Sequence, residues 1–188
     1  QITGIDLVKA QIQIAQGEVL PFKQEDLKIQ GHAIEVRVYA EDAAANFMPG
    51  TGTLREYRRP QGLGVRVDDG LEQGMEVSIY YDPMIAKLIT FGADRAEAIA
   101  RMKRAMSEYR ISGVQTTLDF AQFVMAHEAF VSGDFDTHFV ANYYTPEALD
   151  KSNQELEAVG AMALSNLLQA QKETQHTSTS NGQSRWKQ

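Results

Sequence analysis

Apolar and polar residues alternate most regularly in the segment GHAIEVRVYAED, which runs from Gly31 to Asp42. Successive side chains of a β-strand point to opposite faces of the sheet, so each face of this segment has its own composition. One face carries Ile34, Val36, Val38 and Ala40. The other carries Glu35, Arg37, Tyr39 and Glu41. The pattern predicts a half-buried strand whose polar face is available for chemistry.

Further segments of strand-like composition follow, separated by turns rich in glycine, proline and aspartate. They are about Thr53 to Tyr57, Val65 to Val67, Glu76 to Ile79 and Met84 to Phe91. The frequent turns indicate a mainly antiparallel sheet.

Segments with apolar residues at helical spacing occur before and after these strands. Thr3 with Asp6 resembles a capping box ahead of a first helix that Gly17 ends, and Asp94 with Glu97 resembles another. The second of these helices has an apolar stripe that should lie on the sheet, formed by Ile99, Met102, Ala105, Met106 and Tyr109. A third helix is expected to be capped near Thr117, and a short one should follow Thr137. The predicted fold class is α+β, an antiparallel sheet flanked by helices.

The apolar side of the third helix is expected to be formed by Phe120, Phe123, Val124 and His127. Helix-start chemistry returns at Pro146, and a final helix is expected from about Gln154 to Lys172. The last residues are polar and are expected to be disordered. We therefore divide the chain into a terminal helix with linker (1–25), the α+β domain (26–146), a helical extension (147–172) and a disordered tail (173–188).

Composition excludes several classes of function. The 188 residues carry a net charge of −7 without a basic stripe, which argues against a nucleic-acid partner. Cysteine is absent, so there is no disulfide or thiolate chemistry. The apolar runs are too short to span a membrane, and the four histidines lack metal-ligand spacing. We expect no metal site in this chain.

The strand motif, read together with NFMPGTGTL (46–54), GLGVRVDDG (62–70) and YYDPMIAKLITFG (80–92), resembles the carboxyl-terminal domain of biotin carboxylase. This is the ATP-dependent component of acetyl-CoA, propionyl-CoA, methylcrotonyl-CoA and pyruvate carboxylases. The resemblance covers roughly Gln1 to Pro146. It implies a fragment whose first helix closes an ATP-grasp domain, with the ligands of ATP, Mg²⁺ or Mn²⁺ and bicarbonate lying upstream. The fragment should therefore be inactive alone and bind no cofactor tightly.

The resemblance places Arg37 beside bicarbonate and the ureido ring of carrier-bound biotin. Negative charge develops on the ureido oxygen when biotin loses its N1 proton, and a guanidinium suits that position because it stays protonated and presents a planar set of donors. The alternative is a solvated strand face on which Arg37 merely pairs with Glu35 or Glu41.

Asp82 and Glu35 are expected to support the biotin site. Asp82 precedes Pro83, so its carboxylate either holds Arg37 or a neighbouring group, or only forms an Asp-Pro turn. Lys87 interrupts an apolar run, as an active-site cation or, as we favour, a side chain extending from a strand edge to solvent.

Arg66 and Leu63 lie in the segment that the family uses at its dimer interface, so we expect a homodimer; an exposed strand is the alternative. The resemblance also implies two partners, a biotin carboxyl carrier protein and a carboxyltransferase, and a cytoplasmic or mitochondrial-matrix location. Acetyl-CoA carboxylation for fatty acid biosynthesis is one candidate pathway, although the final acceptor cannot be identified from the sequence. The rival function is a non-catalytic dimerisation or docking module of a carboxylase complex.

Overall fold

A computed structural model describes residues 1–78, 80, 82–149 and 161–165 of the chain. The chain forms two units, Gln1–Pro146 and Glu147–Gln188. In the second unit the described residues, 147–149 and 161–165, are helical. Most of the helix predicted from Gln154 to Lys172, and the whole predicted disordered tail, lie outside the described residues.

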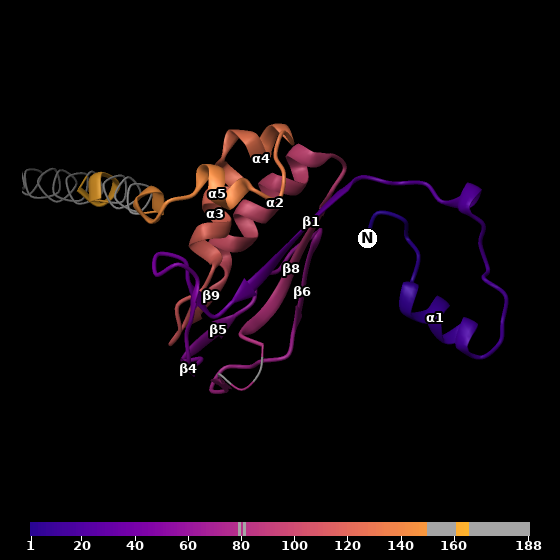
Figure 1. Ribbon diagram of the computed structural model, residues 1–188, viewed down its shortest axis with the longest axis horizontal. Helices are drawn as coiled ribbons and strands as arrows, with labels where there is room; N and C mark the ends of the chain where they lie inside the picture. The colour runs from indigo at the N-terminus through magenta and orange to yellow at the C-terminus, as the bar shows by residue number, and fades with distance from the viewer. Residues whose placement is uncertain (79, 81, 150–160, 166–188) are drawn as a thin grey trace, which may run out of the picture. The chain divides into compact units, whose positions relative to one another are not determined.

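A three-stranded antiparallel sheet forms the centre of the first unit, in the order β1-β8-β6 (Figure 1). Strand β1 is His32–Tyr39, β8 is Met84–Gly92 and β6 is Val65–Asp69. The alternation predicted for β1 is confirmed, because Ile34, Val38 and Ala40 are buried while Glu35 and Arg37 are exposed. A mainly antiparallel α+β fold is therefore confirmed.

Smaller two-stranded sheets extend the fold at one end. They pair β2 (Glu41–Asp42) with β3 (Met48–Pro49), β4 (Gly52–Thr53) with β7 (Glu76–Val77), and β5 (Glu56–Arg58) with β9 (Arg110–Ser112). The single strand expected from Thr53 to Tyr57 is thus two strands. The chain changes partner at the fully buried Leu54, whose N–H donates to the Met75 carbonyl, whereas the next N–H, of Arg55, donates to Ser112.

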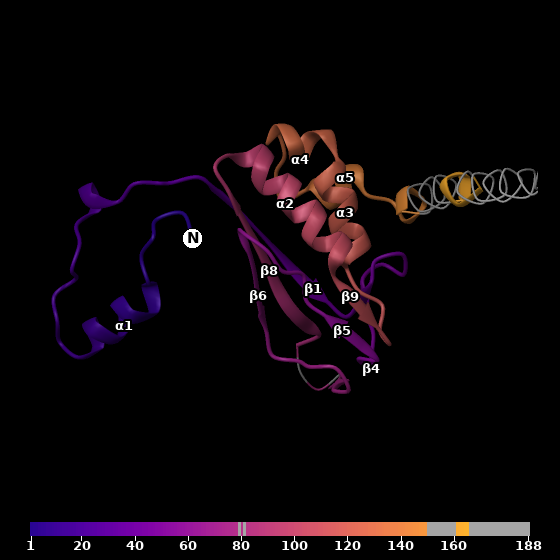
Figure 2. The same ribbon diagram turned by 180° about the vertical axis from the view of Figure 1, so that it is seen from behind.

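Helices α2 (Arg95–Glu108) and α3 (Leu118–Ala126) lie on the same side of the central sheet, as opposite views show (Figure 1, Figure 2). Helix α1 (Leu7–Ala15) and the 3₁₀ turn η1 (Gln24–Asp26) precede the sheet. Helices α4 (Glu128–Ser132) and α5 (Phe139–Tyr143) complete the unit, and the short helix predicted after Thr137 is therefore confirmed. No helix of the described residues has the length and apolar character needed to cross a bilayer.

Capping explains where two of these helices begin. The Asp94 carboxylate accepts from the Glu97 N–H at 2.8 Å, and the Glu97 carboxylate accepts from the Ala93 N–H at 2.5 Å. The predicted start of α2 is confirmed, with the return bond displaced by one residue. The first helix differs from the prediction: its cap is Asp6, which accepts from Lys9, while the Thr3 hydroxyl accepts from Ile5 outside the helix.

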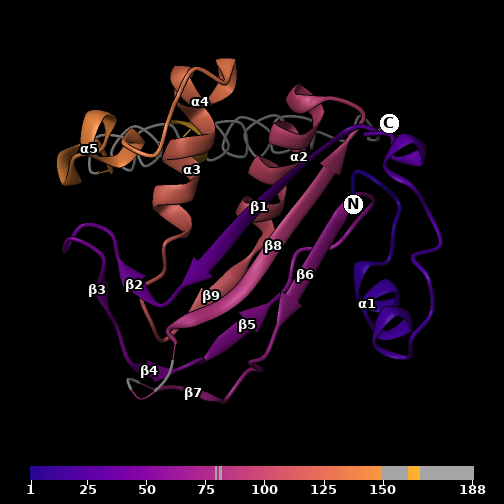
Figure 3. The ribbon, with the colours of Figure 1, turned by 45° about the vertical axis from the view of Figure 1, so that its right-hand side comes forward.

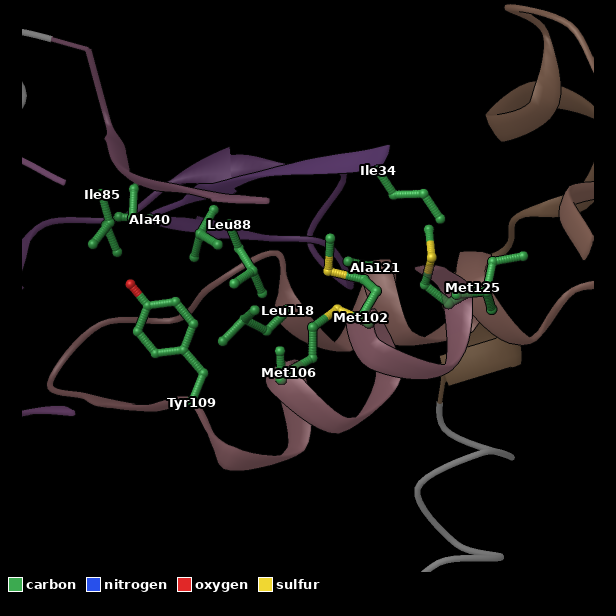
Figure 4. Packing of buried hydrophobic residues seen from close by; sticks show 14 of the residues in the cluster. Ile34, Ala40, Ile85, Leu88, Met102, Met106, Tyr109, Leu118, Ala121 and Met125 are labelled. Atoms are coloured by element: carbon green, nitrogen blue, oxygen red, sulfur yellow. The ribbon is translucent and has the colours of Figure 1, made fainter. Parts of the chain in front are cut away.

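The hydrophobic core lies between the sheet and α2, which contributes the whole predicted stripe (Figure 4). Val38, Leu88 and Met102 have no exposed surface at all. The buried hydroxyl of Thr90, on β8, donates to the Ala98 carbonyl of α2 at 3.0 Å. Helix and sheet are therefore joined without an unsatisfied polar group at this point.

The third helix turns a different side to the core than expected. Leu118, Ala121 and Met125 are its buried residues, whereas Phe120, Phe123, Val124 and His127 are half-buried. The aromatic members of that second set contact other rings instead: Phe120 packs edge-on against Phe47, and Phe123 contacts His127. The sequence pattern identified an apolar side, but the non-aromatic residues Leu118, Ala121 and Met125, three and four apart, are the ones that the core buries.

Candidate functional site on the charged face of the sheet

The strands of the central sheet lie in the order β1-β8-β6 (Figure 3), and their register brings charged residues together on the face opposite α2. We call it the charged face, defined by Glu35, Arg37, Lys87, Arg66 and Asp68. Arg37 of β1 lies opposite Lys87 of β8, which in turn lies opposite Asp68 of β6. In the adjacent row, Ile89 of β8 lies between Glu35 and Arg66. Residues from three separate motifs of the sequence therefore meet on one surface.

Arg37 presents its guanidinium to solvent with few local bonds. Its side chain is 59% exposed, and its Nε lies 3.6 Å from Oε1 of Glu35, which is an ion-pair distance but too long for a hydrogen bond. The Tyr39 side chain, two residues along the same face, raises the pKa of Arg37, and Glu35 adds to this. Arg37 therefore offers a permanently charged, planar set of donors to a ligand.

Thr117 fixes the backbone of β1 at Arg37. Its hydroxyl accepts from the Tyr39 N–H at 3.1 Å and donates to the Arg37 carbonyl at 3.4 Å, and its own N–H donates to the Tyr39 carbonyl at 3.1 Å. The predicted start of α3 near Thr117 is confirmed, because Thr117 is its N-cap residue, but the Thr117 side chain makes no capping bond to the helix. It joins the start of α3 to the end of β1, where the register with β8 also shifts between Val38 and Tyr39.

An apolar groove runs beside Arg37, with a volume of about 340 Å³. Phe47 forms part of its wall together with Phe120, the two rings meeting at 5.0 Å. Asn46 and Phe47 both adopt left-handed backbone angles, with φ of 56° and 57°; asparagine adopts this region readily, whereas it is costly for phenylalanine. The backbone thus accepts strain at Phe47, whose ring lies against α3, next to the strand that bears Arg37.

Asp82 forms the turn before β8. Its carboxylate accepts from the Met84 N–H at 2.9 Å, as in the Asp-Pro turn considered as one alternative. It also lies near Glu41, whose pKa is raised first by burial and then by the Asp82 charge. No hydrogen bond or ion pair to Arg37 is present among the described contacts of Asp82. The support of a biotin site by Asp82 and Glu35 stays a prediction.

Arg66 and Leu63 lie near the opposite edge of the same sheet. The Leu63 side chain is 86% exposed, and Arg66 donates from Nε to Asp68 at 2.7 Å, which raises the pKa of Arg66. A second groove, of about 570 Å³, reaches Arg66, Asp68 and Glu35. The proposed catalytic arginine and the proposed interface arginine thus extend from the two strands that flank β8.

Sequence reasoning missed the role of Thr117 and the position of Lys87. The bonds of Thr117 join residues 78 and 80 positions apart, and a local pattern contains no sign of them. Lys87 itself was identified from the sequence, as the charge that interrupts an apolar run. Its partner could not be identified, because the register of β1 on β8 is not readable from either strand alone.

Metal ligands do not gather in the described part of the chain, where no three His, Asp or Glu residues form a group that could hold an ion. The charged face offers hydrogen bonding by its guanidinium groups and positive charge from Arg37 and Lys87.

Comparisons with known proteins place this fold and face in context. A family model described as the biotin carboxylase C-terminal domain matches residues 35–142. A pyruvate carboxylase subunit of Methanothermobacter thermautotrophicus is 54% identical over 142 residues, which are 76% of this chain and 29% of that protein. Biotin carboxylase 1 of Bacillus subtilis is 51% identical over 142 residues, covering 76% of this chain and 32% of the relative. The chain thus spans about a third of the length of these relatives.

A solved structure is also similar to this chain. The biotin carboxylase domain dimer of Hydrogenobacter thermophilus 2-oxoglutarate carboxylase, in complex with MgADP, ADP and bicarbonate, matches with a TM-score of 0.75 at 40% identity. The match covers 79% of this chain and 32% of that one.

Proposed function

Because the chain belongs to the biotin carboxylase C-terminal domain family, we propose that it serves as this domain in an enzyme that carboxylates biotin with ATP and bicarbonate. The observation that carries the proposal is Arg37, a cation held on a fixed strand with a side chain that is 59% exposed. The family resemblance assigns Arg37 to the biotin site because of its position in the strand motif.

Arg37 acts as an electrostatic stabiliser in this proposal. Removal of the proton from the ureido nitrogen of biotin leaves negative charge on the ureido oxygen, and a guanidinium placed there donates hydrogen bonds to the developing charge. Thr117 keeps the strand in place, so the donors need little reorganisation during the reaction.

The remaining parts of the reaction lie outside this chain in the proposal. ATP, Mg²⁺ or Mn²⁺ and bicarbonate bind mainly to an ATP-grasp segment, and biotin arrives on a carrier protein. The exposed Leu63 and Arg66 contribute to a homodimer interface. A carboxyltransferase passes the carboxyl group to the final acceptor. The relatives act with different acceptors, so acetyl-CoA carboxylation in fatty acid biosynthesis is one candidate among several, and the location is cytoplasmic or mitochondrial accordingly.

The test replaces Arg37 by lysine in the enzyme that carries this domain. Arg37→Lys retains the charge but loses the planar fork, so the rate of ATP-dependent incorporation of labelled bicarbonate into biotin should fall by about 100-fold. The matched control is Arg58→Lys, at an exposed arginine of β5 on another sheet. The control should retain its rate.

The same experiment separates the rival function. A non-catalytic docking module would give near-normal carboxylation in Arg37→Lys, with any loss confined to assembly of the complex. Such a result would remove the catalytic assignment of Arg37.

A further inference from the structure

The loop that joins β2 to β3, residues 43–47, is held in place by a tyrosine from the far end of the first unit. The Tyr144 hydroxyl donates to the Ala43 carbonyl at 2.8 Å, across 101 positions of the sequence. The Tyr144 ring also contacts the Phe47 ring, with the two centroids 5.6 Å apart. Tyr144 therefore contacts both ends of this loop, through a hydrogen bond at its first residue and a ring contact at its last.

The loop needs such support because of the backbone strain at Phe47. Its φ of 57° is costly for a phenylalanine, and a strained conformation persists only where the surrounding structure outweighs the cost. The Phe47 ring packs edge-on against Phe120 at 5.0 Å, and Phe120 packs edge-on against Tyr144, also at 5.0 Å. Each of the three rings thus contacts the other two, and this cluster fixes the position of the Phe47 side chain.

The ring cluster forms part of the apolar groove beside Arg37. Phe47, Phe120 and Arg37 all line this groove, which has a volume of about 340 Å³. Tyr144 is not one of the lining residues, and its hydroxyl is bonded to the backbone of the loop. Any effect of Tyr144 on the groove is therefore exerted through the loop and Phe47.

We propose that Tyr144 is a positioning residue for the reaction at Arg37, because it holds Phe47 as a fixed wall of the groove. A wall that is already in place needs no ordering when the substrate binds, so less of the binding free energy is lost. Release of the loop therefore weakens substrate binding and leaves the chemistry of Arg37 largely intact. The inference rests on the proposed function and adds to its site a residue far from the strand motif.

The experiment measures the KM for free biotin and the kcat in the enzyme that carries this domain. Tyr144→Phe retains the ring and removes the bond to Ala43, so the KM should rise about fivefold, the loss expected for one neutral hydrogen bond. The kcat should stay within about twofold of the wild-type value, because Arg37 and Thr117 are unchanged.

Tyr143→Phe is the matched control, because it removes a hydroxyl from the neighbouring tyrosine. The Tyr143 ring contacts His127 and Phe139, which do not line the groove. Both kinetic constants of the control should equal those of the wild type. Urea denaturation checks that each variant is folded under the conditions of the assay.

Phe47→Gly tests the same relation from the other side, since glycine adopts the left-handed backbone without strain. The substitution removes the wall itself, so the KM for biotin should rise at least as much as in Tyr144→Phe. Adding Tyr144→Phe to Phe47→Gly should raise the KM by less than about twofold more, because no ring is left to hold. Effects of the two substitutions that simply multiply would overturn the role of Tyr144.

The outcomes separate this inference from the proposed function. A folded Tyr144→Phe enzyme with wild-type KM for biotin overturns the inference, while the function stands. If the wild type shows no bicarbonate-dependent cleavage of ATP, the proposed function fails, and amide hydrogen exchange at residues 43–47 decides about Tyr144. Faster exchange there in Tyr144→Phe, with unchanged exchange in β8, supports the hold on the loop, and unchanged exchange in both segments overturns it.

Discussion

The two faces of the central sheet obey different physical rules. On the face toward α2, Val38 and Leu88 have no exposed surface, and the buried Thr90 hydroxyl is bonded to α2. On the charged face, the Arg37 and Arg66 side chains are 59% and 60% exposed, and ion pairs replace close packing. Exposed pairs contribute little to stability, whereas each buried side chain contributes a large share. The first face therefore determines the fold, and the second is free to carry chemistry.

Of the substitutions that test this comparison, Leu88→Ala should lower the stability most. The substitution leaves a cavity at a fully buried position between β8 and α2, and we expect the free energy of unfolding to fall by about 2–5 kcal/mol. Urea denaturation followed by circular dichroism measures the loss. A change below about 1 kcal/mol would mean that the core does not depend on this contact.

Thr117→Val should give an intermediate effect, because Thr117 connects the two faces. The isosteric valine cannot accept from the Tyr39 N–H or donate to the Arg37 carbonyl, so we expect a loss of about 1–3 kcal/mol. Carboxylation by the enzyme should fall too, as Arg37 becomes less well placed. Thr117→Ser retains the hydroxyl and should recover most of both quantities. Equal defects in the valine and serine variants would argue against the hydroxyl.

High pH should destabilise the fold at a cluster of two tyrosines beside the core. The Tyr57 hydroxyl donates to Asp69 at 2.6 Å and lies 2.6 Å from the Tyr109 hydroxyl. Burial raises the pKa of Tyr109 to about 12 and raises that of Tyr57 further. The unfolded chain loses its phenol protons first, near pH 10, so stability is intact below about pH 10 and falls as the pH rises toward about 12.

At about pH 11, Tyr109 alone should account for a loss of about 1 kcal/mol relative to about pH 8. Urea midpoints measured across this range should fall less steeply in Tyr109→Phe than in wild type. Parallel curves would show that this phenol does not titrate differently in the folded protein.

Arg66→Glu should produce the smallest change in the fold of the chain, since it alters only an exposed pair with Asp68. The urea midpoint should stay close to that of wild type. In the enzyme, sedimentation velocity should instead show weaker dimerisation, because the new carboxylate lies beside Asp68 at the proposed interface. A fully retained dimer would remove Arg66 from that interface.

Local sequence patterns predicted much of the sheet face that packs against α2. The alternation in β1, the stripe on α2 and the Asp94 cap are short-range features whose physical causes lie within a few residues, and all are confirmed. The four motifs also identified the family, which the matching family model confirms. The side of α3 that packs on α2 was not predicted, because several apolar residues compete for it.

The charged face depended on distant pairing and was predicted less completely. The alternation identified Arg37 as a polar-face residue, but its neighbours come from other parts of the sequence. Lys87 is brought opposite Arg37 by strand register, and Thr117 is brought to β1 by the packing of α3. Neither relation leaves a periodic signal. The roles of Arg37, Asp82, Glu35, Arg66 and Leu63 in the enzyme stay predictions.

The two faces of the central sheet have different roles in this account, one in stability and one in chemistry. The most direct test is a paired measurement on Arg37→Ala. The urea midpoint of the chain should be unchanged, because the side chain is exposed and its pair with Glu35 is loose. The rate of biotin carboxylation in the enzyme should fall by about 100- to 1,000-fold. A near-normal rate, or a loss of rate that parallels a loss of stability, would contradict the account.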